Sequence, residues 1–302
     1  MKKGTLTILL YHGVTDEKQN GIVNFSGKHV NLKIFEDQMK FIKNKYNILS
    51  MNDVVEIYNM GKGWPNNSVA VTFDDGFKNN YNFAAEILDK YKIPATFYIC
   101  AGMIDTNSMF WVDKIEDCIN RSKNMKIKIK LEDISYFDLN NFSNKVNAVI
   151  QIKKYCKLLS SEKKDNVIKE LIEKTQVIPS SDSSPDYKMM TWSDVNNLNK
   201  NKLFIIGGHT LNHEIMSFQN TENMKKDISS TLSIINYKLN QKTKHFSYPE
   251  GQKHHYNQSV ISTLIDNNII CSPSAVDGIN TDEDLFNLKR IMPNFMGRKF
   301  PF

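Results

Sequence analysis

Two groups of residues in this sequence have types and spacing that suit metal-assisted hydrolysis. Asp74 and Asp75 are adjacent carboxylates, and His209 and His213 are histidines four positions apart. Two imidazoles at this spacing can face one ion. Together with one carboxylate they leave coordination positions open, which suits catalytic zinc or a similar divalent ion. Such an ion polarises an acyl carbonyl while a second carboxylate takes a proton, so we predict one Asp on the metal and the other as base.

Each group also has an explanation that involves no chemistry. Asp favours the N-cap position of helices, so the two carboxylates could cap a helix that begins at Phe77. Two histidines can also lie close together on a surface by chance. Neither pair is decisive alone, and the case for a site depends on whether the fold brings the pairs together.

The candidate residues share one place in the predicted secondary structure, because each lies where a predicted strand ends. In parallel α/β folds the carboxyl ends of the strands form one face, where active sites are built. We therefore expect these residues to converge, although they are far apart in the sequence. They are His12 after strand 5–11, Asp74 and Asp75 after 68–73, His209 and His213 after 203–206, and Tyr248, Pro249 and Glu250 at the end of 244–248.

Short apolar runs alternate with helix-length spacers along most of the chain, which predicts parallel strands joined by crossovers. About seven strands are expected, in a barrel-like α/β fold or an open doubly wound sheet. The periodicity changes over 102–186, which we interpret as a mostly helical insertion within a single domain spanning 1–302. The predicted strands are 5–11, 68–73, 95–100, 203–206, 244–248, 269–271 and 288–292, and the insertion has predicted helices at 110–119 and 146–175.

Five segments carry a resemblance to a known family, and two of them, 10–12 and 288–291, resemble an opening strand and a late strand of one of its branches. Segments 71–76 and 209–213 resemble the first two motifs of the polysaccharide deacetylase family (carbohydrate esterase family 4, the NodB-homology fold), and 246–251 is similar to its third motif. The resemblance implies a distorted (β/α) barrel and a divalent metal, usually Zn²⁺. It also implies Asp74 as general base, with Asp75, His209 and His213 as metal ligands.

The chain departs from this family at two points. The third motif lacks the arginine that orients the base, and Arg290 on a later predicted strand could supply that charge; an ion pair with a surface acid is the other explanation. The family's last motif carries a histidine that acts as general acid, but no histidine follows His255. His12 is the best substitute, unless backbone groups at the strand end satisfy its ring. Tyr248, Pro249 and Glu250 are expected to wall the substrate site.

The composition and the apolar runs of the chain indicate which partners and which compartment to expect. The net charge is +6 and the lysines are spread along the chain, without a basic motif interleaved with aromatics, so we expect no nucleic-acid partner. No apolar run reaches the length of a membrane span, and peripheral membrane contact stays open. The first apolar run is shorter than that of a signal peptide, so a cytoplasmic protein is expected. The four cysteines form no CxxC pair, which argues against a zinc ribbon. The oligomeric state is not predicted.

We therefore expect a metal-dependent hydrolase that removes an N-acetyl or N-formyl group from an amino sugar, in a nucleotide- or lipid-linked precursor of a surface polysaccharide. A non-sugar amide or an O-acetyl ester is a first alternative. A catalytically silent carbohydrate-binding protein on the same fold is a second, because two family residues are missing. A nucleotide-binding protein or a serine hydrolase is disfavoured, since GxGxxG, GxxxxGK[ST] and GxSxG are all absent from the sequence.

Overall fold

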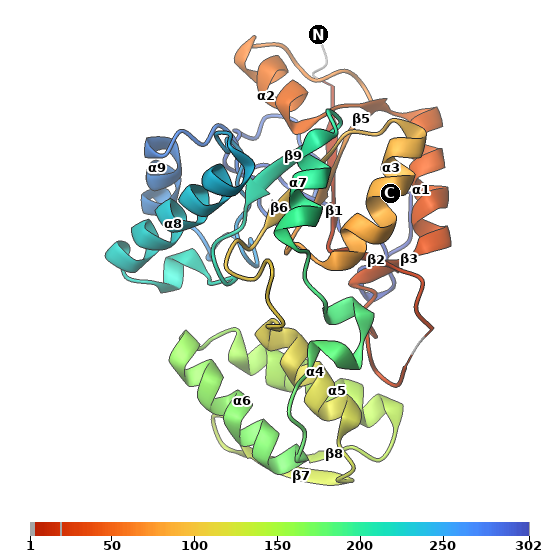
Figure 1. Cartoon of the computed structure of the whole chain (residues 1–302), viewed down its shortest axis with the longest axis vertical. Helices are drawn as coiled ribbons and strands as arrows, with labels where there is room; N and C mark the ends of the chain where they lie inside the picture. Colours follow the sequence, from red (N-terminus) through yellow and green to blue (C-terminus); the bar gives the residue numbers. More distant parts are fainter. Residues whose placement is uncertain (1–3, 19, 302) are drawn as a thin grey trace. The chain divides into compact units, whose positions relative to one another are not determined.

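The computed structural model describes residues 4–18 and 20–301, which divide into two compact units (Figure 1). Unit 1 falls within Met1–Asp16, Ser26–Thr106 and Met189–Phe302. Unit 2 consists of Glu17–Phe25 and Asn107–Lys188. Most of the predicted insertion lies in unit 2, whereas every predicted site residue lies in unit 1. Within the described residues, none of the helices combines the length and apolarity that crossing a membrane requires.

Unit 1 is an α/β barrel built around a parallel sheet of order β1-β5-β6-β9. Bridges continue from β9 to Phe246, and from His245 to Cys271. Backbone hydrogen bonds then join 272–276 to 285–290, and Ile291 pairs with Leu9 of β1. Four strands and three further segments therefore close a ring of seven. The predicted distorted barrel is confirmed, although the last three segments pair too briefly to form regular strands.

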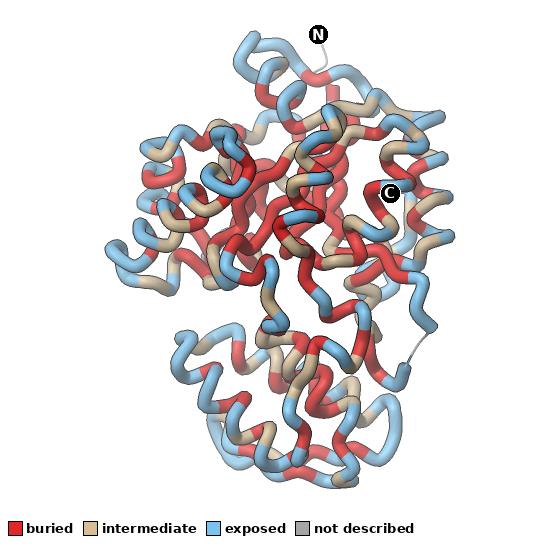
Figure 2. Tube along the Cα trace, in the orientation of Figure 1, coloured by how far each residue is buried: buried red, intermediate tan, exposed pale blue. Residues whose placement is uncertain are grey.

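The sequence of β5 explains its central position in this sheet. All six of its residues are buried, and β-branched Val69, Val71 and Thr72 suit a strand that is covered on both faces. Strand β1 pairs with β5 in parallel, so Tyr11 at its end lies opposite Phe73. Buried residues follow these strands through unit 1 (Figure 2). The strand ends are thus held in fixed register next to Asp74.

Helices surround this barrel and begin at recognisable caps. Ser50 and Asp53 form the capping box of α2, and the Asn220 side chain accepts from Asn223 N at the start of α8. Helix α1 packs on α3, α7 on β9 and α8, and α8 on α9. The elements of unit 1 are β1 Leu6–Tyr11, β2 Gly13–Thr15, β3 His29–Asn31, α1 Leu32–Lys45, β4 Asn47–Ile48, α2 Met51–Asn59, β5 Ser68–Phe73, the π-helix Asn80–Ala84, α3 Ala85–Tyr91, β6 Ala95–Ile99, α7 Trp192–Lys200, β9 Phe204–Gly208, α8 Thr221–Leu239, α9 Gln258–Asp266, and the 3₁₀ turns Met216–Phe218 and Phe295–Gly297.

In its described residues, unit 2 packs three helices and a β-hairpin around its own apolar cluster. The single helix predicted over 146–175 is wrong in extent, because the chain forms two helices separated at 157–160. The hairpin was not predicted, although alternating Lys and Ile in β7 give the buried–exposed pattern of a strand. The elements are α4 Trp111–Arg121, β7 Lys126–Lys130, β8 Ile134–Asp138, α5 Phe142–Cys156, α6 Ser161–Thr175, and the 3₁₀ turns Ser181–Ser183 and Pro185–Tyr187.

Candidate metal centre

Three of the predicted residues form a compact group at the carboxyl ends of β5 and β9. Asp75 Oδ1 lies 3.6 Å from His209 Nε2 and 3.5 Å from His213 Nε2. One ligand atom from each residue lies within 4.8 Å of the other two. Ligands bound tetrahedrally at zinc distances are separated by roughly 3.3–3.5 Å. The donor set and its spacing therefore fit one divalent ion.

The backbone at this group is unusual for residues with a side chain. Asp75 has φ of 76° and His213 has φ of 63°, both in the left-handed region that costs non-glycine residues energy. Gly76 follows at φ of 94°, so the chain turns sharply after β5. Phe77 then forms an isolated bridge with Met189 before the helix begins, so neither Asp74 nor Asp75 is an N-cap. The helix-cap explanation of the Asp pair is thereby removed.

Asp74 lies beside the group and is held by Arg290. Arg290 Nη1 donates to Asp74 Oδ1 at 2.8 Å, and Nη2 donates to Oδ2 at 2.7 Å. Arg290 is 1% exposed, and its Nε also donates to the Ser274 carbonyl oxygen at 2.6 Å. Burial raises the pKa of Asp74, but Arg290 and then His209 oppose it and hold the pKa at about 2. The partner of Arg290 is therefore Asp74 and not a surface acid.

His209 is fixed from its outer side by Ser247. Its Nδ1 lies 2.8 Å from the Ser247 carbonyl oxygen and 2.7 Å from Ser247 Oγ. This arrangement leaves Nε2 facing Asp75. A metal-binding imidazole usually has such a hydrogen-bond partner on the ring nitrogen that does not bind the metal. Burial lowers the pKa of His209, which keeps the ring neutral and able to bind a cation. Sequence reasoning gave Ser247 no role, and its only signal was a hydroxyl within the third motif.

His12 directly follows β1 and is half-buried. Among the residues that the structure describes, no hydrogen-bond partner is found for its Nδ1, so backbone groups do not satisfy this atom. The pKa of His12 is lowered to about 3, chiefly by burial. Asp74 opposes this shift, whereas Lys28 and Arg290 add to it. His12 is therefore neutral at neutral pH before any substrate binds.

The three residues predicted to wall the substrate site differ in how far they are exposed. The Tyr248 ring is 1% exposed, stacks on Tyr256 with centroids 4.0 Å apart, and donates from its hydroxyl to the Phe286 carbonyl oxygen. A ring buried in this way has no surface to offer a sugar, so its prediction as a substrate contact is corrected. Pro249 is also buried, whereas Glu250 is half-buried and stays a prediction.

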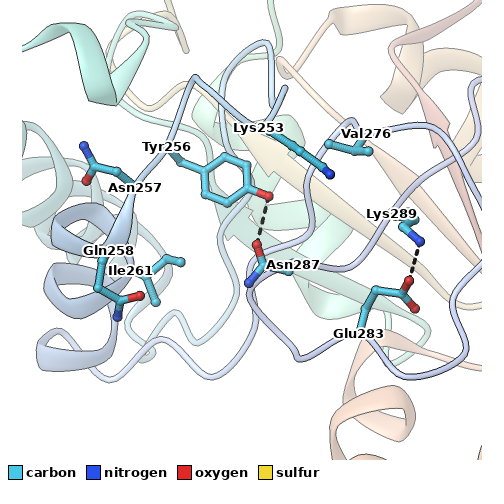
Figure 3. A pocket seen from close by; sticks show the side chains of 9 residues that line it. All are labelled: Lys253, Tyr256, Asn257, Gln258, Ile261, Val276, Glu283, Asn287 and Lys289. Carbon is cyan, nitrogen blue, oxygen red and sulfur yellow. Dashed lines mark hydrogen bonds and ion pairs between the residues drawn. The ribbon is translucent and has the colours of Figure 1, made fainter.

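A separate cavity of about 490 Å³ lies on unit 1 (Figure 3). Its wall combines the Tyr256 hydroxyl, which donates to Asn287, with the ion pair of Lys289 and Glu283. None of the predicted site residues lines it. The lining residues are Lys253, Tyr256, Asn257, Gln258, Ile261, Val276, Glu283, Asn287 and Lys289.

Comparison with known proteins relates this chain to carbohydrate deacetylases. The family model described as "Polysaccharide deacetylase" matches residues 62–269. Poly-β-1,6-N-acetyl-D-glucosamine N-deacetylase of Staphylococcus aureus is 33% identical over 125 residues, which cover 38% of this chain and 42% of that protein. The chain spans less than half the length of the curated relatives it matches.

Two solved structures share the fold over nearly the whole chain. The first is a Streptococcus pyogenes deacetylase, PplD, in complex with acetate; it is 17% identical, has a TM-score of 0.62, and covers 96% of this chain and 93% of its own. The second is IcaB from Ammonifex degensii, with 14% identity, a TM-score of 0.62, and coverage of 97% and 93% respectively. At these identities the likeness establishes the fold.

Proposed function

Because the chain belongs to the polysaccharide deacetylase family, as its motifs predicted, we propose that it hydrolyses the N-acetyl group of an amino sugar with a divalent metal. One observation carries this proposal: a carboxylate and two imidazoles lie within 4.8 Å of one another, beside a second carboxylate that pairs with arginine. Asp75, His209 and His213 would hold the ion, and Zn²⁺ suits their donor atoms. When bound, the ion would polarise the acyl carbonyl and lower the pKa of a water molecule.

Asp74 is the proposed general base. Its Oδ1 accepts from both Arg290 and Ser247, whereas its Oδ2 accepts from Arg290 and lies 3.9 Å from His209 Nε2, a proposed ligand atom. The oxygen nearer the ligand group, Oδ2, is therefore the atom that would take a proton from the attacking water. Arg290 keeps this carboxylate ionised and fixed in orientation, so that it accepts the proton without first rotating.

His12 is the proposed general acid. Amide hydrolysis forms acetate and an amine, so the C–N bond breaks as the leaving nitrogen gains a proton. A neutral imidazole must first receive a proton before it can act as an acid. The negative charge of Asp74 raises the pKa of His12 and so favours its protonated form. This supports the proposal that His12 gains a proton near Asp74 and passes it to the leaving nitrogen.

N-acetylglucosamine units are the proposed substrate. The support is the Staphylococcus aureus relative, whose name specifies poly-β-1,6-N-acetyl-D-glucosamine. The nucleotide- or lipid-linked precursor expected from the sequence would be the substrate if the protein acts in the cytoplasm. The polymer and the precursor contain the same N-acetyl group, so an assay of acetate release from each one distinguishes these two substrates.

Acetate release from β-1,6-linked N-acetylglucosamine oligomers tests this function, with UDP-N-acetylglucosamine and an O-acetylated sugar in parallel. We expect release from an N-acetyl substrate by zinc- or cobalt-loaded protein, and at least a hundredfold less by Asp74→Asn, which keeps the size of the side chain. Release from the O-acetyl ester alone would support an esterase. Binding of the oligomer without acetate release by metal-loaded protein would contradict the enzyme and favour the catalytically silent alternative.

A further inference from the structure

Ser247 connects two residues that the proposed mechanism uses separately. Its side chain is fully buried at the end of the segment that follows β9 in the barrel. Ser247 Oγ lies 2.7 Å from His209 Nδ1 and donates to Asp74 Oδ1 at 3.2 Å. One hydroxyl therefore touches both a proposed metal ligand and the proposed base.

The direction of these hydrogen bonds follows from His209. Its Nε2 faces Asp75 at 3.6 Å, so Nε2 would carry the lone pair for a cation and Nδ1 would carry the proton. Nδ1–H then donates toward Ser247, where the hydroxyl and the carbonyl oxygen are both within reach. A hydroxyl oxygen that accepts from His209 has its own proton free to donate to Asp74 Oδ1. The resulting chain runs from His209 through Ser247 to Asp74.

We propose that Ser247 is a positioning residue that fixes the base relative to the metal ligand. This inference rests on the proposed function and adds to it a residue that the motifs did not assign. Arg290 holds Asp74 from one side through both carboxylate oxygens. Ser247 holds Oδ1 from a second direction, which leaves Oδ2 on the side of the ligand group. Rotation of the carboxylate is restricted by the two contacts together.

The structure separates this role from simple support of His209. The Ser247 carbonyl oxygen lies 2.8 Å from Nδ1 and remains in place when the side chain is changed. Ser247→Ala therefore leaves the imidazole with an acceptor but removes the contact with Asp74. A residue that only supported the ring would lose metal affinity on substitution, whereas a residue that positions the base would lose turnover.

The variants Ser247→Ala, Ser247→Cys and Ser247→Thr test this role. Cysteine keeps the volume with a weaker hydrogen-bonding group, and threonine keeps the hydroxyl. Ser272→Ala is the matched control, since Ser272 is also fully buried and, in the part of the chain that the structure describes, its hydroxyl bonds neither Asp74 nor His209. The measurements are kcat and KM for acetate release, Co²⁺ affinity by chelator competition, and the proton NMR resonance of His209 Nδ1–H in the Co²⁺ protein.

We expect Ser247→Ala and Ser247→Cys to lower kcat by about 10- to 100-fold, the usual range for residues that support a metal site. KM and Co²⁺ affinity should change by less than about threefold, Ser247→Thr should recover most of kcat, and the Nδ1–H resonance should shift in Ser247→Ala but not in Ser272→Ala. A kcat for Ser247→Ala within twofold of the unaltered protein, or an equal loss in Ser272→Ala, would overturn the role of Ser247. Unaltered protein that neither binds Co²⁺ nor releases acetate would overturn the proposed function itself.

Discussion

Replacing Arg290 with methionine should destabilise the protein, because the buried Asp74 carboxylate loses its ion-pair partner. Arg290 makes two charge-assisted hydrogen bonds to Asp74, at 2.8 and 2.7 Å, and Asp74 is 3% exposed. Removal of one partner of a buried ion pair costs about 3–5 kcal/mol, because the other charge stays desolvated. We expect Arg290→Met to lower the free energy of unfolding of the metal-free protein at pH 7 by that amount.

Two comparisons show whether the charge of Asp74 causes this loss. The variant Asp74→Asn/Arg290→Met leaves no lone charge, so it should be more stable than Arg290→Met alone. The loss of unfolding free energy in Arg290→Met, relative to the unaltered protein, should also depend on pH. In the unaltered protein the pKa of Asp74 is lowered from 3.8 to about 2, so its contribution to stability is present above pH 4 and lost as the pH falls toward 2. Without Arg290, burial favours the protonated form of Asp74. The difference in unfolding free energy between Arg290→Met and the unaltered protein should therefore shrink as the pH approaches 3.

Urea unfolding followed by tryptophan fluorescence measures these differences. Two of the three tryptophans, Trp64 and Trp192, lie in unit 1 and report on the barrel. A loss below about 1 kcal/mol in Arg290→Met would refute the reasoning, because a buried unpaired carboxylate cannot cost so little. A double variant no more stable than Arg290→Met would refute it as well.

Two further substitutions test other parts of the account. His12→Gln should lower kcat by about 10²- to 10⁴-fold, the usual contribution of general acid catalysis, with metal content unchanged; a kcat within threefold of the unaltered protein would remove His12 from the mechanism. Gly207→Ala would place a Cβ 2.5 Å from Tyr98 Cδ1 and 2.9 Å from the His245 carbonyl oxygen, so we expect a loss of about 1–3 kcal/mol by urea unfolding. Gly61→Asn, at a site with open space and φ of 65°, is the control, and equal losses at both positions would contradict the packing argument.

Much of the barrel could be predicted from the sequence, because its central strands are short apolar runs with clear ends. The predicted range 68–73 coincides with β5. The convergence of Asp74, Asp75 and His209 followed from one rule, that parallel strands end on the same face. The helix break at 157–160 was missed because leucines there continue the apolar pattern and Ser160 was not recognised as the next start.

The network around the base could not be predicted, because it depends on contacts between distant segments. Arg290 and Asp74 are 216 positions apart, and the sequence left a surface ion pair as an equal explanation. Ser247 could not be identified from its type, since a buried serine commonly bonds to its own backbone. Tyr248 was misassigned because an aromatic residue in a motif suggests ligand contact, whereas its ring here packs on Tyr256.

Metal content of purified protein tests the central claim most directly, because it needs no assumption about the substrate. Mass spectrometry of the unaltered chain should find near one divalent ion per chain, most of it lost in Asp75→Ala and in His209→Ala, while circular dichroism shows that both variants remain folded. His254→Ala, at an exposed histidine outside the ligand group, should keep its metal. A chain that contains no metal and takes up neither zinc nor cobalt, or variants that bind as much as the unaltered protein, would contradict the account.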